Sequence, residues 1–165
     1  MPQRYVVGIG AVPRKNINRA AQALKLFDKK IDLFVMGRPW GVGLQDCRNV
    51  SFLGYIPRGD QPAILAGAQL LLYPSLYEGF GLPILEAMAV GCPVVTSNIS
   101  SMPEVAGRSA ILVDPFEVDN ISSGISTMMS EREKYIKLGK EQAKKFSWGK
   151  MALETDALYR HLVPH

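Results

Sequence analysis

Short apolar runs alternate with helix-length segments along the first two thirds of the chain. The runs fall at residues 5–9, 31–36, 50–53, 70–73, 94–96 and 110–113, and the segments expected to be helical at 17–27, 60–67 and 83–90. Strands that are apolar without alternation are buried on both faces, as in a parallel sheet covered by helices. The pattern predicts an α/β fold with a doubly wound, Rossmann-like parallel sheet of about six strands, with helices on both faces and a helical C-terminal segment from Glu117 onward.

Length and composition fit one domain that spans residues 1–165. The chain has 165 residues, and only two of them are cysteines, which is too few for a disulfide framework or a four-cysteine zinc site. Both histidines, His161 and His165, lie at the end of the chain, so catalysis by a His-containing triad is excluded from the body of the domain. No apolar run is long enough to cross a bilayer and no signal peptide is evident, so we expect a cytoplasmic protein.

The net charge of +4 comes from one segment. Residues 131–150 carry seven basic and three acidic side chains, and the rest of the chain is balanced. Such a segment is either a patch for phosphate or an anionic membrane surface, or a solvated helix face. The interspersed glutamates and scarce aromatic residues favour the solvated face, leaving weak peripheral membrane contact as the alternative and no nucleic acid as partner.

Two helix ends and two aromatic residues carry further expectations. Asn16 is placed to cap the helix at 17–27, and Ser147 to cap the last helix. That last helix is amphipathic, with apolar side chains on or near one face at Met151, Leu153, Leu158 and Leu162. We expect Phe146 and Trp148 to pack and anchor the final helices rather than to form a stacking platform.

The turn after the run at 70–73 has the features of an anion site. Two glycines let a ligand approach the backbone, and Pro83 suits the first position of a helix. Unpaired amides near Gly81 and Leu82, at the positive end of that helix, suit a diphosphate. Glu78 and Glu86 lie on either side of this point, and each has a simpler interpretation: Glu86 as an acid that complements the helix dipole, and Glu78 as a loop carboxylate. Tyr73, at the end of the run, is expected in the core, and Tyr77 in a pocket wall.

The turn at residues 8–16 places two cations, Arg14 and Lys15, at a strand-to-helix junction that faces the first turn across the expected sheet. It approximates the dinucleotide fingerprint glycine-x-glycine-x-x-glycine, but Pro13 replaces the third glycine. That glycine permits close packing of helix on strand, so a nicotinamide or flavin site is disfavoured.

Residues 73–97 closely resemble the signature of family-4 retaining glycosyltransferases of the GT-B fold, including the Glu-x7-Glu motif at Glu78 and Glu86. Other motifs of that family follow in order over the whole chain: Pro13-Arg14-Lys15-Asn16, Leu53-Gly54-Tyr55, Pro103-Glu104-Val105 and Phe146-Ser147-Trp148. The resemblance implies the C-terminal, donor-binding half of a two-domain enzyme. The acceptor-binding half would be a separate N-terminal domain, without which we expect little or no transfer.

The resemblance also implies roles for single residues. Lys15 and Glu78 would be catalytic: Lys15, helped by Arg14 and the amides of Gly81 and Leu82, would hold the diphosphate, and Glu78 would contact the transferred sugar. Glu86 would accept hydrogen bonds from the ribose. The remaining binding residues would shape the sugar pocket (Gly79, Phe80) and border the nucleobase (Tyr55, Ile56). Ala11 stands where many members have an arginine, so diphosphate binding would rely more on Arg14.

The function implied is hexosyl transfer with retention from a nucleoside diphosphate sugar to a glycan or glycolipid acceptor, as in polysaccharide biosynthesis. No cofactor and no metal ion are expected, because the helix end and Lys15 would replace a divalent cation in stabilising the leaving group. The motifs favour a mannosyltransferase that uses GDP-mannose, with UDP- and ADP-sugars left open. The alternative is a stand-alone nucleotide-diphosphate-binding module with a sensory or scaffolding role.

Overall fold

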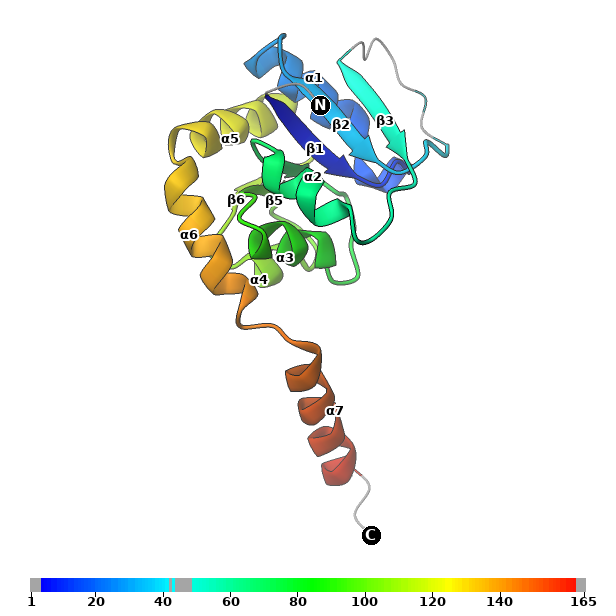
Figure 1. Ribbon diagram of the computed structural model, residues 1–165, viewed down its shortest axis with the longest axis vertical. Coiled ribbons are helices and arrows are strands. Elements are labelled where there is room, and N and C mark those ends of the chain that lie inside the picture. Colours follow the sequence, from blue (N-terminus) through cyan, green and yellow to red (C-terminus); the bar gives the residue numbers. More distant parts are fainter. Residues whose placement is uncertain (1–3, 42, 44–48, 163–165) are drawn as a thin grey trace.

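Six parallel strands form one sheet in the part of the chain that the structure describes. A computed structural model describes residues 4–41, 43 and 49–162, a range that leaves out Cys47. The strand order is β3-β2-β1-β4-β5-β6 (Figure 1). The strands are β1 (Tyr5–Ile9), β2 (Asp32–Met36), β3 (Val50–Gly54), β4 (Leu71–Tyr73), β5 (Val94–Ser97) and β6 (Ile111–Val113). This arrangement confirms the predicted fold. The direction in which successive strands are added to the sheet reverses between β1 and β4, and doubly wound sheets bind ligands at such a point.

Helices cover both faces of the sheet. One face carries α1 (Ile17–Phe27) and α5 (Val118–Ser130), which pack on each other. The other carries α2 (Gln61–Gly67), α3 (Leu82–Ala89) and α4 (Met102–Ala106), with α6 (Arg132–Ala143) packed on α3. A 3-10 turn, η1 (Pro13–Lys15), connects β1 to α1, and α7 (Trp148–Leu162) ends the described chain.

Alternate residues of the central strands feed two separate cores. In β1, Val6 packs with α1 and α5, while Tyr5 and Val7 pack with the helices of the opposite face. β4 does the same, with Leu72 on the first face and Leu71 on the second. All five side chains are buried, which confirms the prediction of strands covered on both sides. The strand ends that carry the candidate site are therefore held by packing on two faces.

Cys92 is a thiol of the core, as its position before a buried strand predicts. It is the free cysteine of the described chain, and burial raises the pKa of its thiol to about 12. A thiol with so high a pKa is not a nucleophile at neutral pH.

The last helix stands away from the domain (Figure 1). Every residue of α7 is exposed, and Trp148 has 71% of its surface accessible to solvent. The expectation that Trp148 is a packing residue is therefore wrong, whereas Phe146 does pack, edge-to-face on Phe80 with 6.0 Å between ring centroids. Ser147 caps α7 as predicted, since its hydroxyl accepts a hydrogen bond of 3.1 Å from the Lys150 N–H. No helix of the described chain is both long and apolar enough to cross a membrane.

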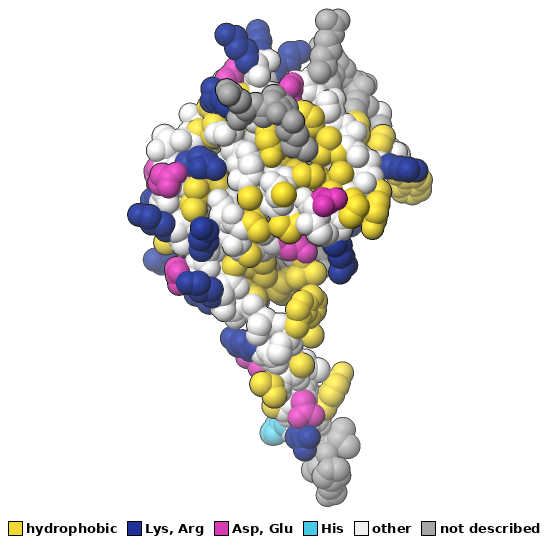
Figure 2. All heavy atoms as spheres, in the orientation of Figure 1, with side chains coloured by type: hydrophobic (Ala, Val, Ile, Leu, Met, Phe, Trp, Pro, Cys, Tyr) yellow, Lys and Arg dark blue, Asp and Glu magenta, His cyan; other side chains and the backbone are white. Residues whose placement is uncertain are grey.

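The basic segment lies along α6 and beyond, where Figure 2 shows basic side chains mixed with acidic ones. Glu131 pairs with Lys134, and Glu141 accepts a hydrogen bond of 2.7 Å from Lys144. These pairs of opposite charge along an exposed face favour the solvated-helix interpretation.

Candidate functional site

Two loops lie side by side at the carboxyl ends of β1 and β4 and are joined by hydrogen bonds. One contains η1, and the other runs from Pro74 to Gly81. The Leu76 N–H donates to the Arg14 carbonyl at 2.8 Å, and the Arg14 guanidinium donates to the Tyr77 carbonyl at 3.2 Å. The two loops that the sequence singles out are therefore joined by hydrogen bonds in both directions.

The charged centre of this site is Glu78. One carboxylate oxygen lies 2.7 Å from Lys15 Nζ and the other lies 3.0 Å from the Arg14 guanidinium. The side chains of Lys15 and Glu78 are only 10% and 9% exposed, whereas that of Arg14 is 50% exposed. A buried carboxylate is stable only when it is paired in this way. Glu78 thus neutralises one of the two positive charges of the predicted diphosphate clamp, through contacts that the sequence does not reveal.

Tyr73 completes the buried cluster. Its phenolic oxygen accepts a hydrogen bond from Lys15 Nζ, and that ammonium also lies 4.4 Å from the centroid of the Tyr73 ring. Tyr73 is buried, as the sequence predicts for a core residue, but it also orients a charged group of the site. The signal for this role is a tyrosine at the carboxyl end of an apolar strand, since a buried phenol needs a polar partner.

Burial and pairing shift the protonation of all three side chains. Burial raises the pKa of Glu78, but the hydrogen bond from Lys15 and its positive charge outweigh this, so the pKa of Glu78 is lowered. Burial lowers the pKa of Lys15, and Glu78 opposes the shift only in part. Burial, followed by the negative charge of Glu78, raises the pKa of Tyr73. At neutral pH the cluster therefore holds Glu78 as a carboxylate and Tyr73 as a neutral phenol.

Two residues with left-handed backbone conformations hold the loop that carries Glu78. Within the described ranges, Asn16 (φ 58°) and Ser100 (φ 59°) are the only non-glycine residues with positive φ. The Asn16 amide donates to the carbonyls of Pro74 at 3.0 Å and Pro115 at 2.7 Å, so its side chain does not cap α1 as predicted. The Ser100 hydroxyl accepts from the Glu78 N–H at 3.2 Å and donates to the Glu78 carbonyl at 2.8 Å. Backbone strain at these two positions is thus concentrated around one loop.

The loop that carries Glu78 leads directly into the amino end of α3. Gly81 precedes the helix with φ 101°, a conformation that favours glycine, and an added Cβ would lie 3.2 Å from Ile84 Cδ1. Neither the Gly81 nor the Leu82 N–H donates a hydrogen bond to any described residue. Pro83 was expected at the first position of this helix, but α3 begins at Leu82, so Pro83 occupies the second position. The two amides predicted to be unpaired at the positive end of this helix are therefore free among the described residues, and their binding of an anion stays a prediction.

The remaining predicted residues lie on three different segments. Gly79 and Phe80 are exposed on the loop that carries Glu78, and Glu86 is exposed one turn inside α3. Tyr55 and Ile56 follow β3 at the edge of the sheet, two strands away from β1, where Tyr55 is exposed. The structure thus brings Arg14, Lys15 and Glu78 into contact and leaves Tyr55 and Ile56 on a separate loop.

The site contains no assembled set of metal ligands in the part of the chain that the structure describes. No group of three His, Cys, Asp or Glu side chains lies close enough together there to hold a metal ion.

Comparison with known sequences places the chain among glycosyltransferases. Residues 3–145 match the family described as glycosyl transferases group 1. O-antigen chain mannosyltransferase B of Escherichia coli is 39% identical over 177 aligned residues, which cover 97% of this chain and 46% of that protein. The chain therefore spans about half the length of this relative.

Solved structures share the fold. Sucrose-phosphate synthase of Thermosynechococcus elongatus superposes with a TM-score of 0.83 at 24% identity, over 98% of this chain and 46% of that one. HepE of Anabaena, solved in complex with UDP-glucose, has a TM-score of 0.71 at 24% identity, over 86% of this chain and 43% of that one. At these identities the likeness supports the fold alone. The family match over residues 3–145, together with the 39% identity to the Escherichia coli relative over 97% of this chain, shows that this chain belongs to the group 1 glycosyltransferases of the GT-B fold.

Proposed function

We propose that this chain binds the donor of a retaining glycosyltransferase, which moves a hexosyl group from a nucleoside diphosphate sugar to a glycan or glycolipid acceptor. The observation that carries the proposal is the presence of two cations and two free amides on two loops that hydrogen bonds join. Arg14 and Lys15 lie at the end of β1, and the Gly81 and Leu82 amides lie at the start of α3. Together they supply the charge that a diphosphate needs.

In this proposal a bound diphosphate takes up part of the positive charge that Glu78 now neutralises. Arg14 is half exposed, so its guanidinium is free to turn from Glu78 toward the phosphates, while Lys15 stays buried beside Glu78. The cations and the helix end would stabilise the departing nucleoside diphosphate, which is where negative charge develops during transfer. Lys15 acts on the leaving group, and Glu78 accepts a hydrogen bond from a hydroxyl of the transferred sugar.

Other side chains would hold the rest of the donor. Glu86 has no hydrogen-bond or ionic partner among the described residues and would accept hydrogen bonds from the ribose hydroxyls. The Tyr55 and Ile56 loop would border the nucleobase. Acceptor binding is assigned to a second, N-terminal domain that would form the opposite wall of the crevice.

The donor proposed is GDP-mannose. The Escherichia coli relative is named a mannosyltransferase, and HepE was solved with UDP-glucose, which supports a nucleotide sugar as the donor class. The comparisons do not support the alternative of a stand-alone sensory or scaffolding module. The name of this relative refers to an O-antigen chain, which supports a role in polysaccharide synthesis.

Weak contact with an anionic membrane surface, on the cytoplasmic side, stays part of the proposal. It would use Lys137 and Lys140 of α6, which are exposed and have no acidic partner among the described residues. Cosedimentation with anionic vesicles, lost in a Lys137→Glu/Lys140→Glu variant, tests it.

Calorimetric titration with GDP, GDP-mannose, UDP-glucose and ADP-glucose tests the donor proposal. Loss of one charge-assisted hydrogen bond costs about 1.5–3 kcal/mol, so Lys15→Ala and Glu86→Ala should each weaken binding roughly tenfold to a hundredfold. Lys137→Ala and Glu104→Ala, which remove exposed charges elsewhere, are matched controls and should bind like the parent chain. Unchanged affinity in both site variants would contradict the assignment.

A further inference from the structure

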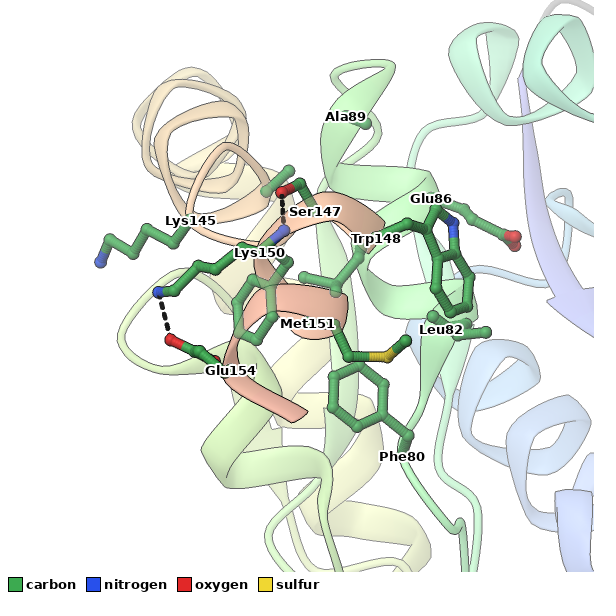
Figure 3. A pocket seen from close by; sticks show the side chains of 13 residues that line it. Phe80, Leu82, Glu86, Ala89, Lys145, Ser147, Trp148, Lys150, Met151 and Glu154 are labelled. Atoms are coloured by element: carbon green, nitrogen blue, oxygen red, sulfur yellow. Dashed lines mark hydrogen bonds and ion pairs between the residues drawn. The ribbon is translucent and has the colours of Figure 1, made fainter. Parts of the chain in front are cut away.

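The two carboxylates of the Glu78–Glu86 motif have opposite surroundings. Glu86 is exposed in the wall of a cavity between α3 and the start of α7, which Trp148 and Met151 also line (Figure 3), so water can solvate its charge. Glu78 is buried, so the hydrogen bonds to its carboxylate must come mainly from the protein or from a ligand. A buried carboxylate that loses a donor costs more free energy than an exposed one. The donors around Glu78 therefore decide how its side chain responds to a ligand.

Ser75 carries a buried hydroxyl in the same loop, three residues before Glu78. Its side chain is fully buried, and its Oγ atom has no hydrogen-bond partner among the described residues. Buried hydroxyls are nearly always hydrogen-bonded in folded proteins, because an unpaired one costs free energy. The unpaired Ser75 hydroxyl therefore points to a partner that it gains when the site rearranges.

The backbone around Ser75 is fixed from two sides. The Ser97 hydroxyl, at the end of β5, donates to the Ser75 carbonyl at 2.6 Å. The N–H of the next residue, Leu76, donates to the Arg14 carbonyl in η1 at 2.8 Å. Because both hydrogen bonds hold the loop, the Ser75 hydroxyl can change its partner by rotation of the side chain alone.

The acceptor that suits this hydroxyl is the Glu78 carboxylate. Burial raises the pKa of Glu78, but the hydrogen bond from Lys15 and then the nearby Ser75 hydroxyl outweigh this and lower it. Tyr73, the other polar side chain of the cluster, is a neutral phenol, so the charged carboxylate is the stronger acceptor. In this structure Lys15 and Arg14 take the two carboxylate oxygens, at 2.7 and 3.0 Å. The Ser75 hydroxyl therefore lies near the carboxylate without hydrogen-bonding to it.

We infer that Ser75 is a positioning residue, whose hydroxyl donates to the Glu78 carboxylate when a bound diphosphate draws Arg14 away. This role rests on the proposed function, in which the half-exposed Arg14 turns from Glu78 toward the phosphates. That movement would leave one oxygen of a buried carboxylate without its donor, and the Ser75 hydroxyl supplies another. With Lys15 on the other oxygen, the carboxylate keeps its orientation toward the transferred sugar.

A double-mutant cycle without nucleotide tests the contact, because Arg14→Met removes the cation that a diphosphate would draw away. In the parent chain Ser75→Ala removes an unpaired hydroxyl, so the urea midpoint should stay the same or rise. In the Arg14→Met background the hydroxyl bonds Glu78, so Ser75→Ala should raise the unfolding equilibrium constant at least fivefold. Ser109→Ala, at a buried serine near the amino end of β6, is the matched control and should have the same effect in both backgrounds.

Ser75→Thr separates hydrogen bonding from packing. It keeps the hydroxyl and adds a methyl group at a fully buried position, so any packing cost should be the same in the parent chain and in the Arg14→Met background. Calorimetric titration with GDP-mannose then tests the role in binding. Ser75→Ala should weaken that binding at least fivefold although it does not destabilise the parent chain, a combination that a purely structural role would not give. Ser109→Ala should bind GDP-mannose like the parent chain.

Two outcomes would overturn the positioning role: an equal effect of Ser75→Ala in both backgrounds of the cycle, or normal GDP-mannose affinity in Ser75→Ala when the parent chain binds this nucleotide. Failure of the parent chain to bind GDP, GDP-mannose, UDP-glucose or ADP-glucose would reject the donor proposal instead. The nucleotide-free cycle would then decide by itself whether Ser75 holds Glu78. Normal nucleotide binding by the parent chain with an equal effect in both backgrounds rejects the role of Ser75 alone.

Discussion

Lys15 Nζ and Glu78 Oε1 lie 2.7 Å apart, although 63 residues separate them in the chain. Because β1 and β4 are neighbours in the sheet, the turns that follow them share one edge. The carboxylate between two cations leaves this cluster with a net charge of +1. In the proposed site, an incoming diphosphate would compete with Glu78 for Arg14, the more exposed of the two cations.

Replacing Lys15 by Met should lower the free energy of unfolding by about 2–3 kcal/mol. The expected loss is at or below the usual cost of breaking a buried ion pair, because Arg14 still pairs with Glu78 in the variant. Lys137→Met, which removes an exposed lysine of α6, should change it by less than about 0.5 kcal/mol. Urea denaturation of both variants measures the difference, and equal costs would show that the pair does not stabilise the fold.

Tyr73→Phe should cost about 1 kcal/mol of stability, because Lys15 loses a hydrogen-bond acceptor while the ring beneath it remains. The same change in a Lys15→Met background should cost much less, since the partner is already gone. This double-mutant cycle, measured by urea denaturation, separates a specific contact from general packing. The same cost in both backgrounds would assign Tyr73 to packing alone.

Stability should fall on acidification below pH 4.5, the ordinary pKa of a glutamate. The pKa of Glu78 is lowered in the folded state, so between that value and 4.5 the unfolded chain binds more protons. The stabilisation is complete above 4.5 and is lost as the pH falls through the folded pKa. Unfolding measured at several acidic pH values should show a smaller slope for Glu78→Gln than for the parent chain. An identical slope would mean that other carboxylates cause the loss.

Ser100→Ala should destabilise the chain more than Ser100→Gly does. Both remove the hydroxyl that bonds the Glu78 backbone, but glycine adopts the left-handed conformation without strain. The difference should be about 1 kcal/mol, visible in the thermal midpoints. Ser126→Ala, at an exposed position of α5, serves as the control and should not destabilise. A lower midpoint for Ser100→Gly than for Ser100→Ala would contradict the role of backbone strain.

Nucleotide affinity should hardly differ between EDTA and excess magnesium. In the proposed site the Arg14 and Lys15 side chains and the Gly81 and Leu82 amides supply the positive charge that a metal ion would otherwise provide. Calorimetric titration with GDP under both conditions measures this. A hundredfold gain with magnesium would require a metal in the binding mode.

The sequence by itself determined the order of strands and helices, because apolar runs and helix-length segments are local patterns of hydrophobicity. It also placed Arg14 and Lys15 on one turn and Glu78 and Glu86 around another, and predicted an anion-binding helix end at Gly81. These features depend on neighbouring residues, and the parallel arrangement follows from burial on both faces.

Only the tertiary structure decided which of these groups touch. The Glu78 carboxylate pairs with both Arg14 and Lys15, and the Tyr73 hydroxyl accepts a hydrogen bond from Lys15. The Asn16 side chain donates hydrogen bonds to the carbonyls of Pro74 and Pro115 instead of capping α1. Trp148 was expected to pack, yet α7 turns away from the domain and leaves it beside a cavity. Such contacts depend on side-chain directions across strands that are far apart in the chain, and local propensities do not contain that information.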